Sequence, residues 1–157
     1  METQTAPLQW VALAAIALSL AACTVVAGLQ PVDGFAHKAI RWDIELYWNC
    51  VRPEPRLLHV EGVAISTYFQ APIQDLTFRL DGVDAQGASV SRVEGAGRDY
   101  LIPLMGQTPY RLILQTVGRE VRFDLTYSFL GQESGGMSNS SESGYSVLKN
   151  ICPVEKR

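Results

Sequence analysis

The sequence has few of the side chains on which catalysis and metal binding usually depend. Its 157 residues include only two histidines, His37 and His59, and neither lies at the spacing of a metal-ligand pair. It has no Gly-x-Ser-x-Gly segment and no cysteine–histidine pair at a spacing suited to nucleophilic catalysis. The pattern therefore predicts a protein that is not an enzyme, with no cofactor and no metal, in which both histidines are structural.

Charge is also sparse and shows no clustering of one sign. The chain has 13 Lys and Arg residues against 16 Asp and Glu residues, and its net charge is −3. Because the basic residues are scattered, the sequence lacks the electropositive footprint of a nucleic-acid-binding protein. A hydrophobic content of 47% is too high for a disordered chain. The roughly 135 residues that follow the N-terminal apolar run suit one domain of ordinary size.

Beyond the N-terminal run, no segment shows a sustained helical period. Apolar and polar residues instead alternate in short runs that are separated by turn residues, the pattern of half-buried antiparallel strands. Strands are predicted at residues 40–48, 57–67, 73–80, 88–93, 100–104, 110–116 and 120–129. The sequence thus predicts an all-β fold, an antiparallel immunoglobulin-like β-sandwich of about seven strands.

The alternation also predicts which side chains face the core. In the first run, Ile40, Trp42, Ile44, Leu46 and Trp48 fall on one face, so both tryptophans are expected inside. In the last run, the same pattern places Val121, Phe123, Leu125, Tyr127 and Phe129 on one face. Residues 49–56, with Pro53 and Pro55, are expected to form a loop. Asp81, Asp84 and Gly87 favour a hairpin turn over a calcium loop, because the late Glu of such a loop is absent.

The N-terminal run from Leu8 to Ala22 has no charge, which is typical of the apolar part of a secretion signal. Its last residues, Leu20-Ala-Ala-Cys23, resemble the lipobox of bacterial lipoproteins. The resemblance implies that residues 1–22 are removed as a signal peptide and that Cys23 carries lipid. Two alternatives stay open: an uncleaved apolar helix over residues 8–29, which is long enough to span a bilayer, and cleavage after Ala27 with release.

The remaining boundaries follow from composition. Residues 23–38, with Pro31 and Gly34, read as a tether, and residues 39–130 as the sandwich domain. Residues 131–144 are rich in Ser and Gly and read as a linker. Residues 145–157 regain apolar character and are expected to add an edge strand or to lie against the sandwich.

Three cysteines leave an even pair if Cys23 is lipidated. An exported protein lies in an oxidising compartment, so Cys50 and Cys152 are predicted to form a disulfide. The alternative is that both remain unrelated free thiols.

The spacing between Leu57 and Phe129 resembles the FxLYD-type β-sandwich of bacterial envelope proteins and, more loosely, the late-embryogenesis sandwiches. The matching residues are Val60, Gly62, the strand 76–80, the hairpin 84–87, the turn 104–110, Leu112 and Leu114. The resemblance implies a fold and an envelope setting and supplies no catalytic residues.

Together these features predict a lipid-anchored protein of the bacterial cell envelope, held at a membrane through Cys23 or through an apolar helix over residues 8–29. It is expected to face the periplasm or the cell exterior, and to lie at the outer membrane in a Gram-negative cell. Its predicted role is that of a non-catalytic binding or assembly module, which meets an envelope partner through an edge strand or a loop. The alternative is a small-ligand-binding or enzymatic protein with a pocket that the sequence does not reveal.

Overall fold

The structure is a computed structural model, and it describes residues 31–69, 71–132 and 141–154. These residues form one short 3-10 helix and nine strands. The elements are η1 Val32–Gly34, β1 His37–Ile40, β2 Ile44–Glu54, β3 Leu57–Ser66, β4 Ile73–Val83, β5 Ser89–Ala96, β6 Leu101–Ile102, β7 Gln107–Gln115, β8 Arg122–Gln132 and β9 Ser141–Leu148.

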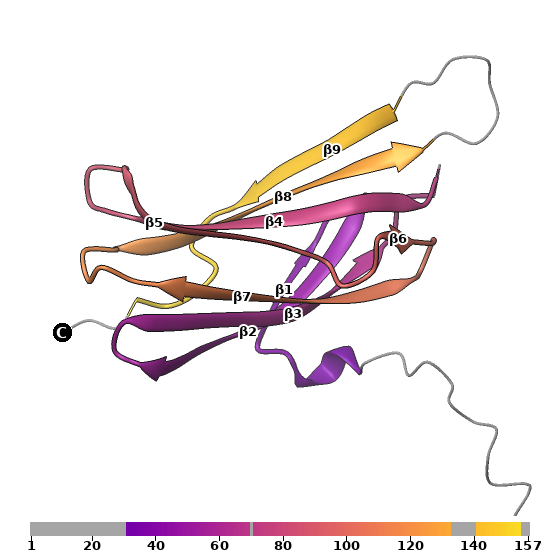
Figure 1. Ribbon diagram of the computed structural model, residues 1–157. Helices are drawn as coiled ribbons and strands as arrows, with labels where there is room; N and C mark the ends of the chain where they lie inside the picture. The colour runs from indigo at the N-terminus through magenta and orange to yellow at the C-terminus, as the bar shows by residue number, and fades with distance from the viewer. Residues whose placement is uncertain (1–30, 70, 133–140, 155–157) are drawn as a thin grey trace, which may run out of the picture.

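Two sheets face each other (Figure 1). Sheet A has the order β1-β2-β3-β7, and sheet B has the order β5-β4-β8-β9, with β6 paired to β4. Every strand pairing is antiparallel. The predicted all-β, antiparallel two-sheet sandwich is therefore confirmed. The described part has nine strands rather than about seven, because a short β1 and the C-terminal β9 join the predicted set.

The core lies between the sheets and is filled by the inward-facing residues of alternating runs. Each sheet contributes large apolar side chains at every second position, as the period of two requires. Trp48 is 5% exposed, so its predicted place in the core is confirmed. The same core cluster includes Ile44, Leu46, Val60, Phe78, Leu80, Leu112, Phe123, Leu125 and Phe129.

The first predicted strand is two strands, and its predicted inward face is wrong at both Ile40 and Trp42. The chain reverses between β1 and β2, where the Arg41 amide donates to the Ile44 carbonyl at 2.9 Å and Ile40 pairs with Glu45. Ile40 and Trp42 are therefore 57% and 67% exposed. Apolar and polar residues keep alternating through this turn, so the sequence pattern gives no sign of it.

The predicted loop over residues 49–56 is also wrong, because β2 continues to Glu54. β1 pairs with β2 only as far as Trp48, so the later part of β2 has β3 alone beside it. Pro53 lies where the register shifts between Val51 and Glu54. A proline is tolerated at such an irregularity on a strand edge because no ladder hydrogen bond from its nitrogen is needed.

Other boundaries shift as well. β5 runs on to Ala96 through a stretch expected to be a turn, and the predicted fifth strand shrinks to the two residues of β6. Val121 precedes β8 and is 50% exposed, so its predicted inward position is wrong. β1 begins inside the predicted tether, and β9 begins inside the predicted linker.

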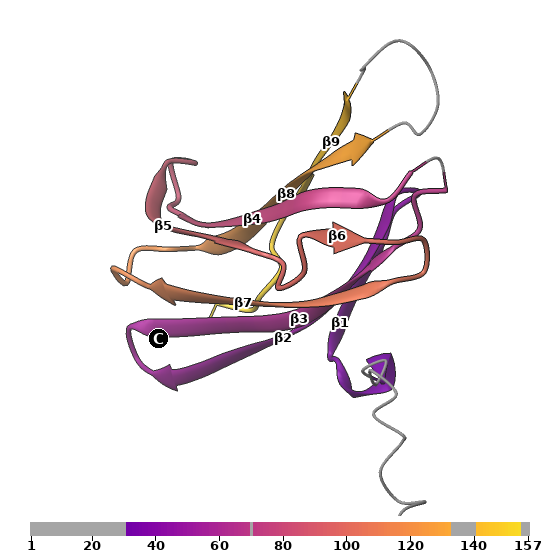
Figure 2. The same cartoon turned by 45° about the vertical axis from the view of Figure 1, so that its right-hand side comes forward.

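The N-terminal predictions, namely the signal peptide, the helix over residues 8–29 and lipid on Cys23, lie outside the described residues. The part that the structure describes has no helix long and apolar enough to cross a membrane. The described chain begins with η1, which lies against the outer face of sheet A (Figure 2). There the Asn49 side chain accepts a hydrogen bond from the Ala36 amide at 2.7 Å and donates one to the Gly34 carbonyl at 3.4 Å.

The two long sides of the sandwich differ. On one side β5 and β7 approach closely, and the Arg98 amide donates to the Pro109 carbonyl at 3.0 Å. Gly95 permits this approach, since a Cβ there would lie 2.8 Å from Leu112 Cδ2. On the other side, β1 and β9 are the edge strands of their sheets. Particular side chains link the two sheets across this second side, and they shape the candidate site.

Candidate functional site: a basic groove at the open edge

We call the long side that carries the edge strands β1 and β9 the open side. A C-terminal segment crosses this open side from sheet B to sheet A. After β9, the Ile151 amide donates to the Phe123 carbonyl at 2.8 Å, and the Ile151 carbonyl accepts from Trp48 Nε1 at 2.9 Å. Cys152 is 1% exposed and forms a disulfide with Cys50, with the two Cα atoms 5.8 Å apart. The predicted disulfide is confirmed, as is the expectation that the C-terminal segment adds an edge strand.

A second link joins the sheets at the other end of the same side. The Tyr127 hydroxyl of β8 donates to the carboxylate of Asp43, in the turn before β2, at 3.2 Å. Burial, together with the negative charge of Asp43, raises the pKa of Tyr127 to about 12. The hydroxyl therefore stays protonated and remains a donor at any physiological pH. The open side is consequently fixed at both ends.

Along this open side runs a groove of about 420 Å³, lined by β1 and by the segment that follows β9. Trp48 belongs to its lining, and His37 stacks on the Trp48 ring with centroids 5.6 Å apart. We call this site the basic groove, because the described residues of its lining include His37, Lys38, Arg41 and Lys149 and none that is acidic. The lining is completed by Ala36, Ala39, Leu148, Asn150 and Ile151.

The groove combines two recognition elements. β1 pairs only with β2, so the outer side of its backbone has no partner strand in the described structure. An edge strand of this kind presents backbone N–H and C=O groups that can pair with an added strand. Lys38, Arg41 and Lys149 are exposed, so their cationic groups can meet negative charge. The arrangement is suited to binding an extended acidic segment.

Sequence reasoning did not find these residues. Lys38, Arg41 and Lys149 are separated by up to about 110 positions, and the chain gives no local signal that they meet. His37 was expected to be structural, and its stacking on Trp48 fits that, although it also lines the groove. His59 lies on β3 away from the groove, with its Nδ1 3.5 Å from the Arg111 guanidinium.

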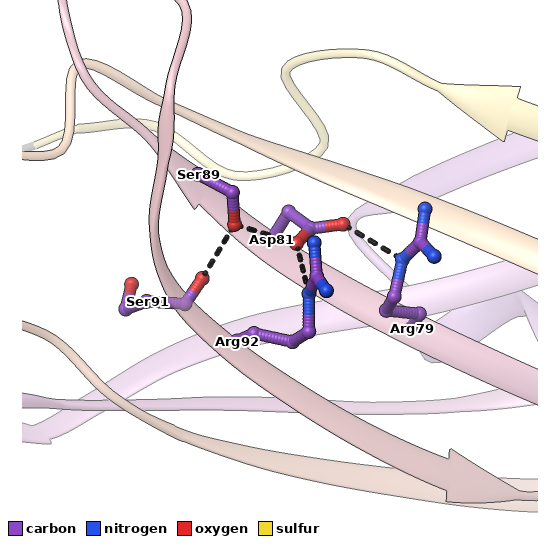
Figure 3. Close-up of polar contacts among 5 residues, drawn as sticks. All are labelled: Arg79, Asp81, Ser89, Ser91 and Arg92. Carbon is purple, nitrogen blue, oxygen red and sulfur yellow. Dashed lines mark hydrogen bonds and ion pairs between the residues drawn. The ribbon is translucent and has the colours of Figure 1, made fainter.

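A separate polar cluster fastens β4 to β5 (Figure 3). Asp81, on β4, accepts from Arg79 Nε at 3.0 Å, from Arg92 Nε at 2.7 Å and from the Ser89 hydroxyl at 2.7 Å. Burial alone would raise the pKa of Asp81, but these hydrogen bonds and the charge of Arg92 hold it below its ordinary value. Both carboxylate oxygens are occupied, so Asp81 serves as an ion-paired structural acid and not as a proton acceptor.

The other residues of this region are turn residues, as predicted. The Asp84 carboxylate accepts from the amides of Gln86 and Ala88 at 3.0 and 2.9 Å, which closes the β4–β5 hairpin. The Asp81 carboxylate contacts arginine side chains and Ser89. It binds none of the groups that Asp84 binds. Among the described residues, no group of three His, Cys, Asp or Glu side chains is placed to hold a metal ion.

A second hollow of about 500 Å³ lies on the outer face of sheet B. Its lining is mixed, with Arg79 and Glu94 of opposite charge and with hydroxyls from Thr77, Thr126 and Ser128. Because Arg79 is already bound to Asp81, its cationic group is committed to a structural ion pair and does not supply a free positive charge to this hollow. The basic groove is the stronger candidate for a binding site.

Comparison with known proteins adds little. No family model and no curated protein matches the sequence. Among solved structures, the chain resembles the GAE domain of yeast GGA1 in a crystal structure. The TM-score is 0.42 at 10% sequence identity, covering 71% of this chain and 97% of that one. So distant a likeness carries no functional argument, and the resemblance to lipoproteins and to the FxLYD family stays a prediction.

Proposed function

We propose that this protein is a lipid-anchored cell-envelope protein that binds an extended, acidic segment of an envelope partner along the open edge of its sandwich. The role is non-catalytic: the groove supplies backbone pairing and positive charge, and neither acid–base chemistry nor a metal is needed. The observation that carries the proposal is the difference between the two long sides of the molecule. One side is closed by β5 and β7, while the other presents β1 beside the basic groove.

Support for the envelope setting comes from the cysteines. Cys50 and Cys152 form a disulfide, which is characteristic of a protein in an oxidising compartment. This pairing leaves Cys23 as the one cysteine for lipid attachment, at the end of the Leu20-Ala-Ala-Cys23 lipobox. Two acyl chains or more on Cys23 would give stable anchoring. We place the mature protein at the bacterial envelope membrane, facing the periplasm or the exterior.

Support for strand addition comes from geometry. The disulfide and the Trp48–Ile151 hydrogen bond fix one end of the groove, and the Tyr127–Asp43 hydrogen bond fixes the sheets at the other end. A rigid groove loses little conformational entropy on binding, so the partner alone bears most of the cost of ordering. Backbone pairing would supply affinity, and the basic side chains would select acidic segments.

The test is a titration with a synthetic peptide of about six residues that alternates Glu and Val, the length of an average strand. The intrinsic fluorescence of Trp48 in the groove reports binding, once Trp10 and Trp42 have been replaced by Phe. Replacing Lys38, Arg41 and Lys149 together by Glu should weaken binding by at least about tenfold, since each exposed ion pair contributes about 0.2–1 kcal/mol and each new repulsion a similar amount.

Controls make the result specific. Arg119→Glu reverses an exposed charge outside the groove lining and should leave affinity unchanged. A peptide with Lys in place of Glu should not bind, and binding of the acidic peptide should weaken as salt rises. Equal affinity of the triple variant and the native protein for the acidic peptide would rule out the proposal.

A further inference from the structure

One end of the sandwich carries a cluster of exposed apolar side chains that the groove does not use. It consists of Trp42 before β2, Phe69 after β3, and Tyr100, Leu101, Leu104 and Met105 between β5 and β7. We call this cluster the apolar end. Phe69, Trp42 and Met105 are 73%, 67% and 65% exposed. Large exposed apolar clusters on a single surface usually mark a site of interaction.

The three segments are fastened to one another, so the cluster is presented as a unit. The Thr67 hydroxyl donates to the Trp42 carbonyl at 3.2 Å, and the Met105 amide donates to the Ser66 carbonyl at 2.8 Å. The Trp42 ring also meets the Tyr68 ring edge-on, with centroids 5.6 Å apart. Met105 has a φ of 60°, in the left-handed region, which a residue other than glycine enters only when its surroundings impose it.

The opposite end of the molecule is different. Its exposed apolar residues near the β7–β8 turn are Val117 and Val121, both 50% exposed, and among the described residues no exposed aromatic side chain accompanies them. A combination of Trp and Tyr with aliphatic side chains is typical of the interface between lipid and water, where an amphipathic ring has one apolar side and one wet side. Thus the apolar end has the exposed aromatic side chains that suit a bilayer interface, and the opposite end does not show them in the described structure.

The short connection between Cys23 and the sandwich would bring the domain close to a bilayer. Eight peptide bonds connect Cys23 to Pro31, where the described structure begins, and this stretch spans at most about 29 Å when fully extended. A lipid on Cys23 would therefore hold the sandwich close to the membrane surface. In both views η1 lies toward the side of β6, whereas the β2–β3 hairpin lies on the opposite side (Figures 1 and 2).

We infer that the apolar end inserts into the interfacial layer of the bilayer to which the N-terminus attaches the protein. This inference rests on the proposed membrane anchoring and adds an orientation to it. With this end at the bilayer, the basic groove lies along the flank of the sandwich and stays open to a partner. The β2–β3 hairpin then points away from the membrane.

Tryptophan fluorescence of the full chain tests the inference, because the three tryptophans report on different places. Trp10 is removed by Trp10→Phe, Trp48 is buried, and Trp42 is exposed at the apolar end. The variant is reconstituted in vesicles of phosphatidylethanolamine and phosphatidylglycerol, with and without bromine on the acyl chains near the headgroup. We expect Trp42 emission to shift to shorter wavelength and to be quenched by the brominated lipid.

Matched variants locate the effect. A Phe69→Ser, Leu104→Ser and Met105→Ser triple variant should lose the quenching while the chain still floats with the vesicles. Val117→Ser with Val121→Ser, at the opposite end, should leave the quenching unchanged. All five side chains are exposed, so the fold is expected to survive, and circular dichroism checks that it does.

The outcomes separate the two proposals. A chain that floats with the vesicles but shows no quenching of Trp42 overturns the inference and leaves the anchoring intact. A chain that does not float overturns both. A shift to shorter wavelength without quenching by brominated lipid means that another copy or the N-terminal segment covers the apolar end, which also overturns the inference.

Discussion

The disulfide between Cys50 and Cys152 should supply a large part of the stability of the domain. The perturbation is the double substitution Cys50→Ala and Cys152→Ala, which removes the crosslink and adds no bulk to the buried site of Cys152. The two cysteines are 102 positions apart, so the bond closes a long loop in the unfolded chain. In the chain-entropy model, losing a loop of that length costs about 4.7 kcal/mol of unfolding free energy.

Noncovalent contacts beside the disulfide determine how much stability remains after the bond is lost. The Trp48–Ile151 and Ile151–Phe123 hydrogen bonds still hold the C-terminal segment, and each contributes about 0.5–1.5 kcal/mol. β9 keeps its ladder with β8, so we expect the sandwich to survive with lower stability. The C-terminal segment should become the first part to open.

Urea unfolding of residues 31–157, followed by tryptophan fluorescence, measures the effect. With an m-value of about 1–3 kcal/mol per molar, the midpoint should fall by at least about 1.5 M. Reduction of the native protein should give a similar midpoint, and reducing agent should leave the double variant unchanged. Equal midpoints for the variant and the oxidised native protein would refute the reasoning, as would titration of both cysteines as free thiols in the unfolded, unreduced chain.

Three further predictions concern buried polar groups. Tyr127→Phe removes a donor to the buried Asp43 carboxylate and should lower the unfolding free energy by about 1–3 kcal/mol in the same urea assay; an unchanged midpoint would contradict this. Tyr110→Phe removes a buried hydroxyl that has no hydrogen-bond partner in the described structure, so stability should stay the same or rise by up to about 1 kcal/mol; a loss would show that the hydroxyl is paired. Burial alone would raise the pKa values of Asp81 and Glu120, but their hydrogen bonds outweigh it and lower both pKa values. The contribution of the two carboxylates to the unfolding free energy should therefore be complete above their ordinary pKa values of 3.8 and 4.5, and it should be lost as pH falls further. Thermal midpoints measured across this range should fall with pH in the native protein and fall less in Asp81→Asn.

The sequence allowed the class of fold to be predicted because each sheet is half buried. A strand with one face in the core must alternate, and the runs around Leu46, Phe78, Leu112 and Leu125 do so. The disulfide could be predicted by counting cysteines, without knowledge of their positions in space. These features depend on local periodicity or on composition, and both can be read along the chain.

The positions of chain reversals, and the places where residues far apart in the sequence come together, could not be predicted in the same way. The turn at Arg41 to Asp43 preserves the period of two, and Pro53 carries the usual signal of a loop although β2 runs through it. The basic groove depends on where β1 and the segment after β9 lie in the two sheets. That arrangement is a property of topology, and no spacing in the sequence reports it.

Amide hydrogen exchange at β1 tests the central claim most directly. The claim is that the outer backbone edge of His37–Ile40 pairs with an added acidic strand beside the basic groove. With the Glu–Val peptide bound, the amides of β1 that are not bonded to β2 should exchange more slowly, while those of β5 on the closed side should not change. Unchanged exchange at β1 in the presence of saturating peptide, or equal protection on both sides, would contradict the account.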